Sequence, residues 1–132
     1  MTKKIVNTTD APAPIGPYNQ AIMAGETLYI SGQVCIDPQT GQLANKDIQE
    51  ETHRVMQNLQ AILKHAGMDF KNVVKTTIFI TDMNRFSEVN GVYERYFDCD
   101  LPEVPVFPAR ETVQVSALPK FVNVEISMIA VK

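Results

Sequence analysis

The chain has 132 residues and a formal net charge of −3, and 45% of its residues are hydrophobic against 20% charged. This size and composition are those of one soluble globular domain, residues 1–132, with enough chain for a sizeable core. The acidic balance disfavours nucleic acid as a partner. No apolar run approaches the length of a membrane span and the N-terminus lacks the apolar core of a signal peptide, so we expect a cytoplasmic protein.

Short strand patterns separated by turn residues make up the first part of the chain. They cover Ile5–Val6, Tyr18–Met23, Thr27–Ser31 and Gln33–Ile36. The stretch Ala24-Gly25-Glu26 is a hairpin signal, whereas residues 11–17 are too rich in proline for regular structure.

The hydrophobic period then changes from that of a strand to that of a helix. Apolar residues form one helical stripe from about Asp47 to Ala66, and Gly67 is a C-terminal stop. A β-branched strand follows at Val73–Ile80. A second amphipathic helix is expected from about Arg85 to Phe97.

Two strands are expected after an irregular, proline-punctuated loop at Asp98–Pro105. One carries Arg110 and the other Glu125, with a turn at Leu118-Pro119-Lys120. This element order indicates an α+β fold in which a mixed sheet has both helices on one face. The last strand is apolar on both faces, so we expect self-association to cover the face without helices.

Cysteine, acidic and glycine patterns give no sign of a metal or a nucleotide cofactor. Cys35 and Cys99 lie far apart, and we expect free, buried thiols rather than a disulfide. No HExxH, Cys/His cluster, Walker loop or GxGxxG is present, so we expect no cofactor. Several acidic residues, Glu51 among them, read as ordinary solvated helix faces.

Arg110 and Glu125 are the two ionisable residues in the most constrained settings. Pro108 stiffens the entry to the strand that carries Arg110, and a guanidinium fits a carboxylate bidentately. Glu125 interrupts the most apolar strand pattern of the chain. Together they suggest a small site for a carboxylic acid. From the residues alone, a structural ion pair also explains Arg110, and a solvent-facing position at a sheet rim also explains Glu125.

Three further positions have two readings each. Tyr18 is a half-buried strand aromatic or a site residue, and Ser31-Gly32-Gln33 is a β-bulge or part of a site. Asn90 is a tolerated polar residue of the second helix or a hydrogen-bonding group of an interface.

Eight short segments, in order and spread over the whole chain, match sequence motifs of one protein family. They are Ile15-Gly16-Pro17-Tyr18, Ser31-Gly32-Gln33, Asp37-Pro38-Gln39-Thr40-Gly41, Val74-Lys75-Thr76-Thr77, Asp82-Met83-Asn84, Val89-Asn90, Phe107-Pro108-Ala109-Arg110 and Val124-Glu125-Ile126. With them the chain resembles the Rid family of YjgF-type reactive-intermediate deaminases. It looks like the active branch, because the arginine and the glutamate of that branch are both matched.

The resemblance implies a fold, an assembly and a reaction. The fold is that of trimeric chorismate mutase, with the sheets forming a central barrel in a homotrimer and the active clefts lying between subunits. The reaction is metal-free hydrolysis of 2-imino acids, such as 2-iminopropanoate, to 2-keto acids and ammonia. It removes products of the enamine 2-aminoacrylate, which damages pyridoxal-phosphate enzymes.

Roles for single residues follow from the same resemblance. Arg110 would hold the substrate carboxylate, and Glu125 would handle the attacking water. The cleft would be lined or supported by Tyr18, Ser31, Gly32 and Asn90. Thr112 would offer its backbone N–H to the carboxylate. Many family members have cysteine at that position, so thiol-based switching there is in doubt for this chain.

Two other functions remain open from the sequence. The first is a non-catalytic trimer that binds keto acids or serves as a regulatory or chaperone-like partner. The second is inhibition of translation by RNA cleavage, against which the acidic balance argues. A binding protein needs Arg110 but not Glu125, which distinguishes it from the deaminase.

Overall fold

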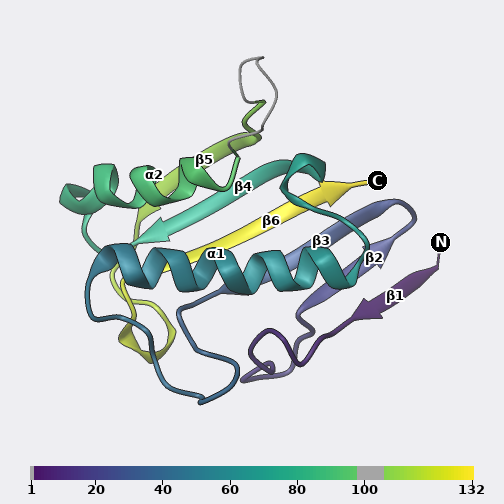
Figure 1. The fold of residues 1–132 in the computed structure, drawn as a ribbon, viewed down its shortest axis with the longest axis horizontal. Helices are drawn as coiled ribbons and strands as arrows, with labels where there is room; N and C mark the ends of the chain where they lie inside the picture. Colours follow the sequence, from purple (N-terminus) through teal and green to yellow (C-terminus); the bar gives the residue numbers. More distant parts are fainter. Residues whose placement is uncertain (1, 98–105) are drawn as a thin grey trace.

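The computed structural model describes residues 2–97 and 106–132, where six strands form one sheet in the order β1-β2-β3-β6-β4-β5. β4 and β5 are parallel, whereas the other neighbouring pairs are antiparallel. Helices α1 and α2 lie on the same face of the sheet (Figure 1). The α+β fold with a mixed sheet and two helices on one face is confirmed.

The strands and helices have the following bounds. They are β1 Lys3–Val6, β2 Ala21–Ala24, β3 Thr27–Gln33, α1 Ile48–His65, β4 Val73–Ile80, α2 Phe86–Arg95, β5 Ala109–Gln114 and β6 Val124–Val131. Short 3-10 helices lie at η1 Phe70–Asn72, η2 Met83–Arg85 and η3 Pro119–Phe121.

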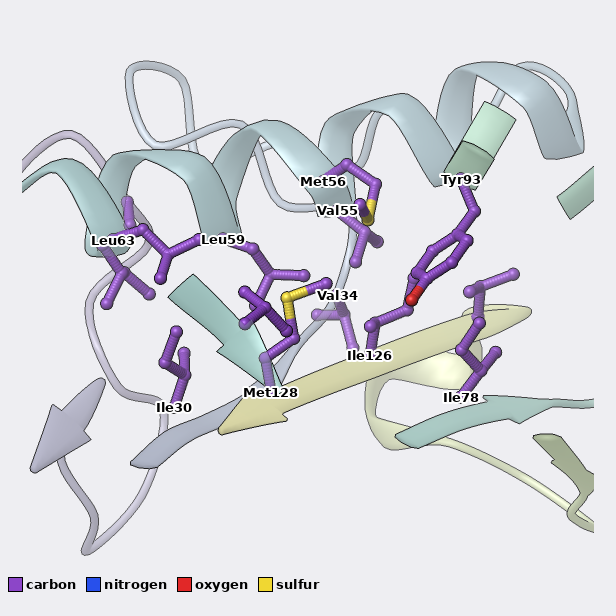
Figure 2. Close-up of a cluster of buried hydrophobic side chains, with 14 of the residues drawn as sticks. Ile30, Val34, Val55, Met56, Leu59, Leu63, Ile78, Tyr93, Ile126 and Met128 are labelled. Carbon is purple, nitrogen blue, oxygen red and sulfur yellow. The ribbon is translucent and has the colours of Figure 1, made fainter. Parts of the chain in front are cut away.

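Helix α1 begins and ends where the sequence predicts. The Asp47 side chain accepts a hydrogen bond from the Glu50 N–H, which caps the first turn. Gly67 follows the helix with φ of +75°, a conformation that favours glycine. Figure 2 shows the apolar stripe of α1 packed against the sheet, with Leu59 above Met128.

Two expected strand boundaries are wrong. β2 starts at Ala21 rather than at Tyr18, because the preceding residues form loop contacts. The Gln20 amide donates to the carbonyls of Thr8, Ala11 and Pro12, and so ties the proline-rich segment to the sheet. The expected strand Gln33–Ile36 does not form either: β3 continues through Gln33, and Ile36 makes an isolated bridge to Leu43.

The face of the sheet without helices, which we call the open face, has an apolar part over β1, β2, β3 and β6 and a polar part over β4 and β5, where Lys75 pairs with Glu111. One cross-strand row on it contains Ile5, Ile22, Tyr29 and Ile129. Ile5 is 65% exposed and Tyr29 is 50% exposed. Simple alternation from Phe79 would place Val73 on this face, but Val73 is buried, because a β-bulge between Val73 and Lys75 shifts the alternation.

Cys35 and Glu51 are two fully buried ionisable residues. Cys35 is a free, buried thiol, as expected, and burial raises its pKa to about 11. Cys99 and the expected Asp98–Pro105 loop lie outside the described residues. The expectation that Glu51 is solvated is wrong, because its side chain is fully buried. None of the described helices is long and apolar enough to cross a membrane.

Candidate active site

Arg110 is held by three side chains of α2. Its Nη1 donates to the Asn90 Oδ1 at 2.7 Å. Its guanidinium carbon lies 5.1 Å from the ring centroid of Tyr93 and 5.6 Å from that of Phe86, within cation–π range. The Tyr93 hydroxyl donates to the Thr76 Oγ1 at 3.0 Å, which fixes the ring that supports Arg110.

The ion-pair reading of Arg110 finds no support in the described residues. Their two ion pairs are Lys75–Glu111 and Arg85–Glu88, so no described carboxylate lies within 4.0 Å of Arg110. Its guanidinium instead opens onto a pocket of about 330 Å³, lined by Asn90, Tyr93, Glu94, Phe107, Pro108 and Arg110. This arrangement suits an anionic ligand small enough to lie against one guanidinium.

Thr112 lies two residues beyond Arg110 on β5 and therefore points to the same face of the sheet. Its Oγ1 is buried and has no hydrogen-bond partner among the described residues. A buried hydroxyl without a partner is uncommon in a native fold. Thr112 thus shares a sheet face with Arg110, although it does not line the Arg110 pocket.

Glu125 lies on β6 between β3 and β4, so the alternative of a position on an edge strand of the sheet does not apply. The side chain is half-buried, and burial raises its pKa. No lysine or arginine of the described residues pairs with it. The carboxyl group occupies the space where Gly32 lacks a side chain: a Cβ on Gly32 would lie 2.6 Å from the Glu125 Cδ.

The β-bulge reading of Ser31-Gly32-Gln33 is confirmed, since the β3–β6 register shifts between Ile30 and Gln33. The Ser31 Oγ donates to the Asn19 carbonyl at 2.6 Å. Tyr18 lies in the loop before β2, 44% exposed, and its hydroxyl accepts a hydrogen bond from the Ile15 N–H. Tyr18 and Gly32 both line a small hollow of about 20 Å³.

The structure divides the expected site residues into two groups. Arg110 pairs with Thr76 of β4, which is buried under the helices, whereas Glu125 pairs with Phe79, three residues further along. Because side chains alternate between faces, Arg110 and Glu125 lie on opposite faces of the sheet. We call Asn90, Arg110 and Thr112 the arginine half-site, and Tyr18, Ser31, Gly32 and Glu125 the glutamate half-site. Within one chain these half-sites do not meet.

Phe86 and Tyr93 support the arginine half-site but are not among the predicted site residues, because both fit the apolar stripe of an amphipathic helix. The sequence does contain a pattern that indicates this contact. Phe86, Asn90 and Tyr93 are spaced four and three residues apart, which places them on one helix face. A polar residue between two aromatic residues on such a face indicates a polar contact at that point. A larger groove of about 810 Å³ on α1 contains none of the expected site residues.

The family model described as Endoribonuclease L-PSP matches residues 8–132. The chain belongs to the Endoribonuclease L-PSP family. A curated relative, the 2-iminobutanoate/2-iminopropanoate deaminase of Mus musculus, is 50% identical over 130 residues, which are 98% of this chain and 92% of the mouse protein. The corresponding deaminase of Bos taurus is 48% identical over 132 residues, covering 100% of this chain and 92% of its own length. The resemblance to the Rid family is thereby confirmed.

Solved structures of this L-PSP family share the fold closely. A protein of the conserved Rid family, YyfA from Yersinia pestis, has a TM-score of 0.92 and 47% identity, covering 99% of this chain and 100% of that one. TdcF from E. coli, solved with bound serine, has a TM-score of 0.90 and 40% identity, covering 98% of each chain.

Proposed function

We propose that this L-PSP family member is a 2-imino acid deaminase. It hydrolyses 2-iminobutanoate or 2-iminopropanoate to the 2-keto acid and ammonia, and so removes a reactive product of pyridoxal-phosphate enzymes. The observation that carries this proposal is the full-length identity of 50% with the mouse deaminase. The open guanidinium of Arg110 supports it, because every 2-imino acid carries a carboxylate that such a group can bind.

The working unit in this proposal is a homotrimer with one active site at each subunit boundary. Two features support it. The open face of the sheet has an apolar part with Tyr29 half exposed, and such a patch is normally covered. The arginine and glutamate half-sites lie on opposite faces of one chain, so a complete site needs two chains. A closed ring of three sheets satisfies both requirements.

The chemistry requires an anchor, a proton carrier and a water. Arg110 of one subunit holds the carboxylate, with its own plane fixed by Asn90 and Tyr93. Glu125 of the neighbouring subunit takes a proton from water as the oxygen attacks the imine carbon, and a carbinolamine forms. The same carboxylic acid then donates the proton to nitrogen. As ammonia leaves, the hydroxyl group of the carbinolamine gives its proton back to the Glu125 carboxylate, and its oxygen remains as the ketone of the product.

Partial burial suits Glu125 to this exchange. Desolvation raises its pKa, which brings a carboxyl group closer to the working pH and makes it a better base and acid in turn. Positioned proton transfer of this kind typically contributes about 10²–10⁴-fold in rate. A contribution of that size is sufficient, since protonated imines already hydrolyse readily in water.

An amino-acid oxidase or a threonine dehydratase can generate the imine in the presence of the purified protein. The decay of the imine is then followed directly. Faster decay with the wild-type protein, lost in both Arg110→Ala and Glu125→Ala trimers, supports the deaminase. Decay at the uncatalysed rate with folded wild-type protein refutes it.

The alternative, a non-catalytic binding protein, draws on one specific observation. The related TdcF structure contains bound serine, so a member of this fold holds an amino acid. A binding protein of this kind would keep its affinity for 2-keto acids in Glu125→Ala and lose it in Arg110→Ala, without accelerating imine decay in either form.

A further inference from the structure

Glu51 is a buried carboxylate that the proposed reaction does not use. It lies in the first turn of α1, and its side chain is 0% exposed. A buried charge requires compensation, yet no described lysine, arginine or histidine lies within 4.0 Å of this carboxylate. Its hydrogen bonds come instead from the segment that leads into β6.

These hydrogen bonds hold two consecutive residues. The Glu51 Oε2 accepts from the Asn123 N–H at 2.7 Å and from the Val124 N–H at 2.9 Å. The Glu51 Oε1 accepts from the Asn123 Nδ2 at 2.8 Å. On the other side, the Asn123 carbonyl accepts from the Thr81 N–H at 3.0 Å, just beyond β4. The entry to β6 is therefore held between α1 and the end of β4.

The Val124 N–H needs a partner from α1 because β3 does not supply one. The pairing of β3 with β6 ends at Gln33, opposite Ile126. Val124 itself is fully buried, so water does not reach its N–H. The Glu51 carboxylate therefore accepts the hydrogen bond that a carbonyl group of β3 would otherwise accept.

We propose that Glu51 is a positioning residue for Glu125, a proposal that rests on the deaminase function. Glu125 directly follows Val124, and its side chain leaves β6 on the opposite face from α1. A shift of the backbone at residues 123 and 124 therefore moves the Glu125 carboxyl group, which has little free space because it lies against Gly32. Catalytic groups tolerate such shifts poorly: a misplacement of about 1 Å can reduce the rate about 100-fold.

The test separates positioning from stability. Glu51→Leu removes all three acceptor contacts, and we expect kcat to fall at least about tenfold while KM changes less than about twofold, because the arginine half-site is untouched. Glu51→Gln keeps one oxygen for the two backbone N–H groups. We expect it to retain at least about half of the wild-type kcat.

Asn58→Leu is the matched control for burial. Asn58 is a fully buried polar residue of the same helix, and its Nδ2 donates to the carbonyls of Val34 and Ile36 at 3.0 Å. We expect a lower Tm for this variant and an unchanged kcat at a temperature well below unfolding. Should Glu51→Leu fail to fold, Asn123→Ala carries the test, because Asn123 is exposed and the variant loses only its side-chain hydrogen bond to Glu51 and the longer one, 3.4 Å, from the Thr81 hydroxyl. We expect its kcat to fall about threefold at constant KM.

Two results overturn the inference. One is a kcat of Glu51→Leu and Asn123→Ala equal to that of the wild type while Glu125→Gln is inactive; in that case the deaminase stands and the positioning role falls. The other is an equal loss of kcat in Glu51→Leu and Asn58→Leu, which reduces the effect to stability. A folded wild-type protein without imine hydrolysis removes the deaminase and the positioning role together.

Discussion

Arg110 depends on its neighbours for its direction rather than on an opposite charge. The Tyr93 ring and the Asn90 amide approach its guanidinium from α2, and the free edge faces the pocket. The Tyr93 hydroxyl does not contact Arg110 itself; it donates a hydrogen bond to Thr76 and so fixes the ring that does. The ring and the hydroxyl can therefore be tested separately.

We expect Tyr93→Leu to raise KM for the 2-imino acid about tenfold, since it removes a desolvated cation–π contact that typically contributes about 0.5–2 kcal/mol. Tyr93→Phe keeps the ring and serves as the control, with KM within about threefold of the wild type. Steady-state kinetics with an enzymatically generated imine measures both variants. An equal KM in all three proteins contradicts the proposed support of Arg110 by the ring.

Glu125 illustrates a conflict between activity and stability. Its folded-state pKa is raised by burial above the ordinary glutamate value of about 4.3. The folded state therefore disfavours the ionised form: the penalty is absent below the ordinary pKa and is fully present above the raised one.

Glu125→Gln removes that penalty together with the catalytic group. We expect the variant to have a higher Tm than the wild type at about pH 8 and an equal Tm at about pH 3.5, where the native carboxyl group is protonated in both states. Thermal unfolding at the two pH values measures the difference. A wild-type protein that is the more stable of the two at the higher pH contradicts an unpaired, desolvated Glu125.

At the scale of elements, the bulge in β3 makes room for a side chain of β6. Gly32 lies where a methyl group would overlap the Glu125 carboxyl group. This contact is between two strands, and neither strand alone indicates it. The contact with the Glu125 carboxyl group explains why position 32 needs glycine, even though the φ of Gly32 is not in the left-handed region.

Gly32→Ala should therefore displace Glu125 and lower kcat at least about tenfold. Gly91→Ala in α2 is the matched control, because a Cβ at that position meets no atom within 4 Å. It should leave kcat unchanged and stabilise the helix by about 0.5–1 kcal/mol. Kinetics and urea unfolding of the two variants test the pair. Full activity of Gly32→Ala would mean that the carboxyl group does not work from the observed position.

Sequence periodicity predicts the main elements well, because each has one dominant pattern. The stripe of α1 and the β-branched run of β4 give their bounds to within one residue. The errors occur where side chains override local pattern: Gln20 holds the chain before β2 in a loop, and Glu51 lies buried although its helical position reads as solvated. Both depend on partners eight or more residues away, which the local hydrophobic period does not reveal.

The resemblance indicates candidate site residues, but not the rings of Phe86 and Tyr93 that support Arg110, nor the division of the candidate site between two faces of the sheet. The motifs identify Arg110 and Glu125 by resemblance to the Rid family. Their separation onto opposite faces follows from the register of β4 with β5 and β6, which only the folded sheet defines.

At the scale of the whole molecule, each chain of the proposed trimer contributes its arginine half-site to one active site and its glutamate half-site to another. The apolar part of the open face and the two separated half-sites both point to an assembly in which each boundary joins Arg110 of one copy with Glu125 of the next. Such a ring has three equivalent boundaries, and every chain contributes to two of them. The central claim is therefore a shared site, and it makes a quantitative prediction.

Subunit mixing tests this claim most directly. Arg110→Ala and Glu125→Gln trimers, each inactive alone, are unfolded together in equal amounts and refolded. Every mixed trimer then contains one boundary with both native residues, so we expect about a quarter of the wild-type imine-hydrolysing activity to return. Sedimentation confirms that the mixture is trimeric. A trimeric mixture that stays as inactive as its parents would contradict a site shared between subunits.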